Sequence, residues 1–173
     1  MVDLVVVADG MIKAGHTSPG RLIEAAGAWN GRGCRLARKA ASLAREGVDS
    51  PQETRLRLLL VLAGLPEPRV NLIIRSRDGG WRRRYDLGYE HLRLIIEYDG
   101  RQHSEDTAQW LTDIYRREEL DQMRWRLIIV TSEGIYREPL RTLERVRDAL
   151  LESGAVGIRR TFKPEWRLYF PAR

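Results

Sequence analysis

Ile95-Ile96-Glu97-Tyr98-Asp99-Gly100-Arg101-Gln102-His103 is the stretch that decides the fold and the candidate site, together with Tyr85-Asp86-Leu87 ten residues earlier. Both segments join apolar residues to acidic ones. A carboxylate close to a protein core is costly unless a cation or hydrogen bonds compensate its charge. Several such carboxylates together indicate a site for a hard divalent cation, which prefers oxygen ligands.

Three short segments around this stretch have the composition of strands: Val70–Ser76, Arg82–Leu87 and Leu92–Tyr98. The connections between them are of hairpin length, so we expect an antiparallel meander. Alternation along the last strand places Arg93, Ile95, Glu97 and Asp99 on one face. A simple hairpin that pairs Leu87 with Leu92 sets Asp86 and Glu97 at opposite ends, so the two acids meet only if the strands slide or splay.

Helical segments surround these strands. Ser50-Pro51-Gln52-Glu53 has the pattern of a capped helix start, and Gly64 ends that helix. A predicted helix over Glu105–Met123 leads to a fourth strand over Trp125–Thr131, and Glu138–Ser153 is a further helix. A strand, helix and strand in this order form a right-handed crossover with parallel strands. The expected fold class is α/β (α+β), with a mixed central sheet of about four strands flanked by helices.

The chain divides into three parts. Residues 1–48 predict a helical N-terminal extension, with helices over Leu4–Met11, Gly20–Trp29 and Arg35–Glu46. Residues 49–153 hold the α/β domain. Residues 154–173 form a basic and aromatic tail, for which docking as an edge element of the sheet is one option that the sequence does not decide.

Composition limits the class of protein. The 173 residues include 30 basic and 24 acidic ones, for a net charge of +6, and all but three of the basic residues are arginine. Arginine is suited to phosphate contact, although a GC-rich genome would give the same bias. Cys34 is the single cysteine, which excludes an internal disulfide. Apolar stretches are too short to span a membrane and the start lacks a signal-peptide pattern, so we expect a cytoplasmic protein without a membrane partner.

The order of these pieces resembles the very-short-patch-repair (Vsr)-like endonuclease domain of the PD-(D/E)XK nuclease superfamily. The resemblance covers Ser50 to Ser153, and the helical segment before it resembles an AbiEi-like antitoxin segment. The residues that carry it are, in chain order, Glu53, Asp86, Glu97-Tyr98-Asp99-Gly100, His103, Asp113, Arg117, Leu120 and the strand Trp125–Thr131.

The resemblance implies a restriction-endonuclease-like core with a Mg²⁺ or Mn²⁺ site. Asp86 and Glu97 match the acidic pair that holds the metal, and Glu53 matches the helix acid that completes the site. Asp99 and His103 match the acidic and histidine positions of the Vsr-like branch, and Asp99 joins the metal ligands. The superfamily's lysine, two residues after the second acid, is replaced here by Asp99. His103 is therefore the expected substitute for handling the proton of the attacking water.

Each of these residues also has a purely structural interpretation. Glu53 is the third residue of a capping box begun by Ser50. Asp86 can end a strand before a turn, and Asp99-Gly100 is an ordinary turn pair. His103 can be a surface or capping residue. The residues alone leave both interpretations open.

The basic residues around the same elements point to a polyanionic partner. Arg84, Arg101 and Arg117 are the candidates for phosphate contact, although solvated helix and strand faces also carry arginines. The hypothesis is a metal-dependent DNA endonuclease, with RNA as an alternative substrate. The alternative function is a non-catalytic DNA-binding or antitoxin-type regulator that retains the nuclease fold. Cutting both strands usually needs two active sites, which a homodimer would supply.

Overall fold

The fold is known from a computed structural model that describes residues 1–76, 80, 82–100 and 107–171, with the side chains of 107–113 outside the description. Its centre is a four-stranded sheet in the order β1-β2-β3-β4. The strands are β1 (Arg69–Arg75), β2 (Arg82–Tyr89), β3 (Leu94–Tyr98) and β4 (Arg126–Val130). The first three form an antiparallel meander, and β4 runs parallel to β3. The predicted mixed sheet is confirmed, and the fold class is α+β.

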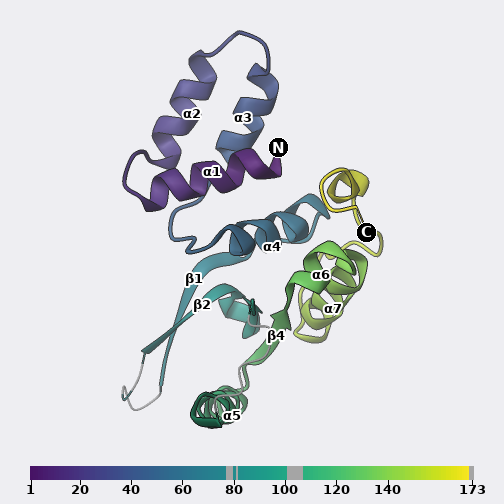
Figure 1. The fold of residues 1–173 in the computed structure, drawn as a ribbon. Coiled ribbons are helices and arrows are strands. Elements are labelled where there is room, and N and C mark those ends of the chain that lie inside the picture. The colour runs from purple at the N-terminus through teal and green to yellow at the C-terminus, as the bar shows by residue number, and fades with distance from the viewer. Residues whose placement is uncertain (77–79, 81, 101–106, 172–173) are drawn as a thin grey trace.

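Helices precede the sheet and cover it (Figure 1). Three helices, α1 (Val2–Lys13), α2 (Pro19–Ala28) and α3 (Cys34–Leu43), lie beyond α4 (Pro51–Leu62). The crossover helix α5 (Thr107–Gln122) joins β3 to β4. After β4 come α6 (Ser132–Tyr136), which the sequence pattern did not predict, and α7 (Pro139–Glu152).

Two apolar clusters lie on opposite faces of β3. Leu94 and Ile96 belong to the main core, which also takes in apolar residues of α4 and α7. Ile95 belongs to a second cluster with Leu120 of α5. This split follows from the alternation of side chains along a strand, which the sequence predicted.

A buried polar network joins the N-terminal helices to α4. Arg57 is fully buried, and its guanidinium lies 3.1 Å from the carboxylate of Asp9 on α1. Asp9 also accepts a hydrogen bond from the Thr54 hydroxyl at 2.9 Å. The same guanidinium donates to the Leu43 carbonyl at the end of α3, at 2.8 Å. Because removing one partner would leave a buried charge uncompensated, this network fixes α1 and α3 on α4.

The connection between β2 and β3 differs from the prediction. Gly88 and Tyr89 were expected in a turn, yet both belong to β2, and a single 3-10 turn over Glu90–Leu92 (η1) makes the connection. Arg93 closes this turn with φ of 51°. The prediction that Arg93 belongs to the face of β3 is therefore wrong. Gly88 suits the strand because a Cβ there would lie 2.3 Å from Leu72 Cδ2. A larger residue at this position would require the Leu72 side chain to shift.

The C-terminal tail packs on α4 instead of joining the sheet as an edge element. Pro164–Leu168 (η2) is a 3-10 turn, and Trp166 and Phe170 are buried in the main core. The Lys163 backbone N–H donates to the Ala63 carbonyl at 2.9 Å, at the end of α4. Proline at the first position of η2 favours the turn, and the burial of Trp166 and Phe170 in the main core holds the tail on α4. Among the described residues, no helix is long and apolar enough to cross a bilayer.

Candidate functional site

The register of β2 and β3 brings the two principal acids together. Leu87 pairs with Ile96, so the next positions outward along the ladder are Asp86 and Glu97. The Asp86 carboxylate also accepts a hydrogen bond from the backbone N–H of Tyr98 at 2.8 Å. The simple hairpin, which would have separated the two acids, is not formed. Strand β2 continues through Tyr89, so the turn begins at Glu90 and not at Gly88.

The strands change orientation at Asp86. Asn71 of β1 has φ of 51°. It lies opposite Asp86, between the pairs Val70–Leu87 and Leu72–Tyr85. Regular alternation would place Tyr85 and Leu87 on one face, but they belong to different apolar clusters. The alternation of side chains along β2 is therefore interrupted beside Asp86.

Burial and neighbouring charges raise the pKa of Asp86 from 3.8 to about 7. Burial is the largest cause, and the carboxylates of Glu53 and Glu97 raise the pKa further. The Tyr98 backbone N–H and the Arg116 guanidinium act in the opposite direction. Burial and the neighbouring carboxylates disfavour the charged form of Asp86. A bound cation would stabilise that charged form.

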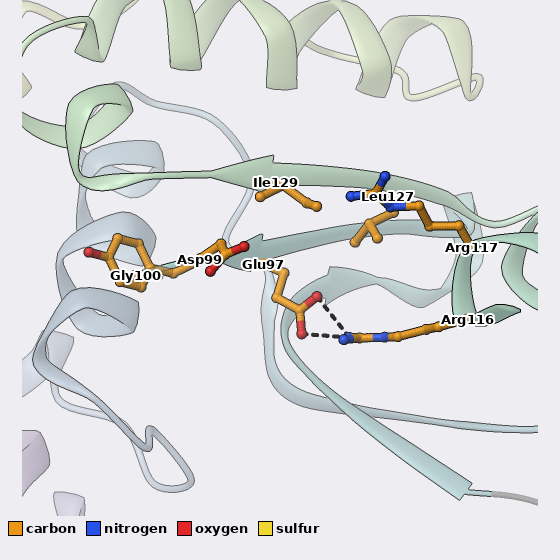
Figure 2. Close-up of a pocket in the computed structure, with 8 residues that line it drawn as sticks. Glu97, Asp99, Gly100, Arg116, Arg117, Leu127 and Ile129 are labelled. Atoms are coloured by element: carbon orange, nitrogen blue, oxygen red, sulfur yellow. Dashed lines mark hydrogen bonds and ion pairs between the residues drawn. The ribbon is translucent and has the colours of Figure 1, made fainter. Parts of the chain in front are cut away.

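Glu97 is held by an arginine that the sequence analysis did not select. One guanidinium nitrogen of Arg116, Nη2, lies 2.6 Å and 2.7 Å from the two carboxylate oxygens. Figure 2 shows the Glu97 carboxylate turned toward Arg116. The guanidinium also lies over the ring of Tyr85, 4.6 Å from its centroid. Arg116 is four residues before Leu120, a buried residue of α5, and this spacing was the available signal that Arg116 faces the sheet.

Glu53 has a structural role that is visible directly. The Ser50 hydroxyl accepts a hydrogen bond from the Glu53 backbone N–H at 3.2 Å, and the Glu53 carboxylate accepts one from the Asp49 backbone N–H at 2.9 Å. The first bond is that of the predicted capping box, whereas the return bond goes to Asp49, one residue before the Ser50 cap, and not to Ser50 itself. The side chain is nevertheless close enough to raise the pKa of Asp86, so the structural role does not remove it from the site.

A pocket of about 270 Å³ opens at the carboxyl end of β3. It is lined by Glu97, Tyr98, Asp99, Gly100, Arg116, Arg117, Leu127 and Ile129. Asp99 lies two residues beyond Glu97, and its backbone N–H donates to the Val130 carbonyl at 2.9 Å. In Figure 2 the two arginines leave α5 in different directions, Arg116 toward Glu97 and Arg117 toward Leu127 of β4.

The remaining candidates have different outcomes. Arg84 forms an ion pair with Asp49, away from the pocket lining. Arg117 lines the pocket, as its predicted role in phosphate contact requires. His103 and Arg101 lie outside the described residues.

The donor set suits a loosely held divalent cation better than a closed metal cage. Among the described residues, no group of three His, Cys, Asp or Glu side chains is arranged to hold a metal ion, so the predicted set of Asp86, Glu97, Asp99 and Glu53 does not form one joint group of ligands. Mg²⁺ commonly uses one or two carboxylates and completes its shell with water and substrate phosphate oxygens. The neighbouring acids Asp86 and Glu97, in an environment that disfavours negative charge, fit this requirement.

A second depression continues from the pocket along β4, with a volume of about 550 Å³. The two share Arg117, Leu127 and Ile129 in their linings. Arg126 and Arg145 also line the second depression, which we call the β4 groove. Arg145 donates to the Ile129 carbonyl at 3.2 Å, a neutral partner that leaves its charge available. The lining also includes Asp121, and Arg126 forms an ion pair with Glu152. The groove thus has three arginines against one acid and leads away from Asp86 and Glu97.

Comparison with known proteins gives distant relatives and no family. No protein family model matches the chain, and no solved structure matches it. Two similar proteins of Mycobacterium tuberculosis are "Uncharacterized protein MT2308" of strain CDC 1551 / Oshkosh and "Uncharacterized protein Rv2248" of strain ATCC 25618 / H37Rv. Each is 29% identical over 115 residues, which are 66% of this chain and 42% of the relative. The chain therefore spans less than half the length of these relatives.

Proposed function

We propose that the chain is a metal-dependent DNA endonuclease with a site of the Vsr-like, PD-(D/E)XK type. The observation that carries the proposal is the position of Asp86 beside Glu97 at the ends of β2 and β3. Two adjacent acids, one of them with a pKa raised to about 7, favour a divalent cation at this place. The β2 acid and the β3 acid are the pair that the sequence resemblance selected.

The residues would divide the work of phosphodiester hydrolysis. Asp86 and Glu97 would hold Mg²⁺ or Mn²⁺, and Glu53, fixed by its capping box, would keep a negative charge next to Asp86. When bound, the cation lowers the pKa of a water molecule and neutralises charge on the phosphate. Asp99 lines the pocket where the reacting phosphate would lie. His103, at the position implied by the resemblance, would take the proton of the attacking water.

The β4 groove supplies a path for the substrate. Arg117 of α5 lines both the acidic pocket and the groove, and Arg145 of α7 lines the groove, where it contacts the Ile129 carbonyl of β4. Arginine guanidinium groups contact phosphates well because their planar arrangement of donors matches phosphate oxygens. One strand of DNA along the groove would bring a phosphate to the acids at its end.

The test is a cleavage assay with supercoiled, linear and mismatched DNA in Mg²⁺ or Mn²⁺. We expect Glu97→Gln and Asp86→Asn to lower the cleavage rate roughly 10²-fold or more, because the cation supplies several kcal/mol to the transition state. Glu90→Gln is the matched control, since Glu90 lies in the β2–β3 connection and pairs at the exposed surface with Arg69. Full activity in both site variants would remove the site assignment. The absence of cleavage by the unmodified chain would remove the nuclease proposal.

A second candidate function is a DNA-binding regulator that has lost catalysis. Two observations favour it: Asp99 stands where the superfamily has lysine, and Arg116 already neutralises Glu97. This protein would bind DNA along the β4 groove with or without a divalent cation. Retained binding without cleavage, in the assay above, is the result that selects it.

A further inference from the structure

We propose that Arg116 and a divalent cation are alternative partners of the Glu97 carboxylate. Arg116 would hold the acid in the metal-free protein and move aside when the cation binds. The inference rests on the proposed metal site and adds a regulatory step to it, since loading of the cation would require the Arg116–Glu97 ion pair to open.

The ion pair has a geometry that can be exchanged. Both oxygens of Glu97 are approached by the same nitrogen of Arg116, at 2.6 Å and 2.7 Å. The strongest arginine–carboxylate pairs use two parallel N–H donors, one for each oxygen. Arg116 Nε is buried and has no hydrogen-bond partner within the described part of the chain. An unsatisfied buried donor is unfavourable, so the present arrangement is not the best that this guanidinium can make.

The position of Arg116 gives it somewhere to move. Its side chain is 22% exposed, and that of Glu97 is 20% exposed, so the pair is neither sealed in the core nor free in solvent. Both residues line the pocket of about 270 Å³. A guanidinium that leaves Glu97 can therefore enter the pocket while its stem stays on α5.

The charges favour the exchange. Glu53 and Glu97 both act against the negative charge of Asp86, and Arg116 opposes them with one positive charge. A divalent cation brings two charges to the same carboxylates and is often the largest local charge in a site. The metal-bound state would therefore neutralise the acids more completely than the guanidinium does.

The released guanidinium would have a use. Arg117 already lines the same pocket, and Arg116 would join it there. Two guanidinium groups facing the pocket could contact a phosphate held at the acids, which is the task left open by the replacement of lysine with Asp99. Arg116 would then be a positioning residue for Glu97 before loading and a phosphate contact after it.

The test starts from the full chain after all metal has been removed with a chelator. Titration with MnCl₂, followed by calorimetry, then gives the affinity for Mn²⁺. We expect Arg116→Gln to bind Mn²⁺ on the order of tenfold more tightly than the unmodified chain, because the competing cation is gone. Arg83→Gln is the matched control. Arg83 of β2 forms a partly buried ion pair with Glu119 of α5, the helix that carries Arg116. Its replacement removes one positive charge, as Arg116→Gln does. We expect its Mn²⁺ affinity to stay unchanged. Equal or weaker binding by Arg116→Gln would overturn the exchange.

Thermal unfolding gives a second measurement. In EDTA, Arg116→Gln should unfold at a lower temperature than the unmodified chain, because Glu97 then lacks a counter-charge, and Mn²⁺ should remove most of the difference. If Arg116→Gln does not fold, Arg116→Lys keeps a charge without the planar group and should bind Mn²⁺ more tightly than the unmodified chain by a smaller factor. Failure of the unmodified chain to bind Mn²⁺ would overturn the metal site and the exchange together. Binding by the unmodified chain without a gain in either variant would overturn the exchange alone.

Discussion

The backbone N–H of Tyr98 lies 2.8 Å from the carboxylate oxygen Oδ2 of Asp86, and this hydrogen bond fastens the β2 acid to the strand that carries Glu97. It keeps the acid in place although burial and two neighbouring carboxylates act against its charge. An acid retained in such surroundings is a common feature of functional sites. The first prediction follows from its protonation.

The stability of the metal-free protein should fall as the pH rises through the range set by Asp86. Its pKa is about 7 in the folded chain against the ordinary 3.8, so between these values the folded state binds more protons than the unfolded state. The free energy of unfolding therefore decreases from about pH 4 to about pH 7 and levels off above. Urea unfolding in EDTA at a series of pH values measures this.

Asp86→Asn identifies the residue responsible. The variant should be more stable than the unmodified chain at pH 8 and should lose the decrease below pH 7 that Asp86 causes. Asp148→Asn, at the exposed surface of α7 beside Arg147, is the control and should keep the original pH dependence. If Asp86→Asn shows the same pH dependence as the unmodified chain, another group is responsible.

Two substitutions of Glu53 should distinguish the effect of its hydrogen bond at the start of α4 from the effect of its charge. Glu53→Gln keeps an acceptor for the Asp49 backbone N–H, so its stability should stay close to that of the unmodified chain. Glu53→Ala should lose about 1 kcal/mol of unfolding free energy, because the cap is then incomplete. Urea unfolding at pH 8 measures both variants. Equal loss in both would show that the carboxylate's charge, and not the cap, stabilises α4.

The β4 groove should bind DNA through its arginines. Arg145→Gln should weaken binding to a fluorescent duplex in EDTA, and the slope of log affinity against log salt should decrease by about 1, as expected for one lost phosphate contact. Arg141→Gln is the control, because Arg141 lies on the same helix and pairs with Glu138 at the exposed surface. Fluorescence anisotropy over a range of salt concentrations gives both quantities. An unchanged slope for Arg145→Gln would exclude the groove as the path of the phosphates.

The N-terminal helices should depend on Arg57. Arg57→Met leaves the buried Asp9 carboxylate without its ion pair, and such losses typically cost about 3–5 kcal/mol. Urea unfolding should show this loss for the single variant. The double variant Arg57→Met with Asp9→Leu should recover part of it, since both charges are then removed. A single variant as stable as the unmodified chain would mean that the network does not hold α1 on α4.

Much of the fold could be predicted because local patterns determined it. The Ser50 cap and Glu53 marked the start of α4, and the strand, helix and strand order fixed the parallel pairing of β3 with β4. The register of β2 against β3 could not be predicted, since β2 continues through Gly88 and Tyr89, two residues whose pattern is typical of a turn. The tail likewise depended on tertiary packing, through Trp166 and Phe170.

The candidate site was predictable in part for a related reason. Acids near apolar runs are visible in a sequence because they break a pattern, and Asp86, Glu97 and Asp99 were selected in this way. Arg116 breaks no pattern, since arginine is common on helix surfaces. Its role depends on which face of α5 meets β3, and that is a property of the packed structure.

The most direct test of the metal site is the anomalous scattering of Mn²⁺ in crystals of the full chain grown with MnCl₂. We predict a peak bound by the carboxylates of Asp86 and Glu97, with oxygen ligands at about 2.0–2.6 Å, and its loss in Asp86→Asn. A fully loaded crystal with no peak at these carboxylates, or with a peak elsewhere that Asp86→Asn leaves unchanged, would contradict the assignment.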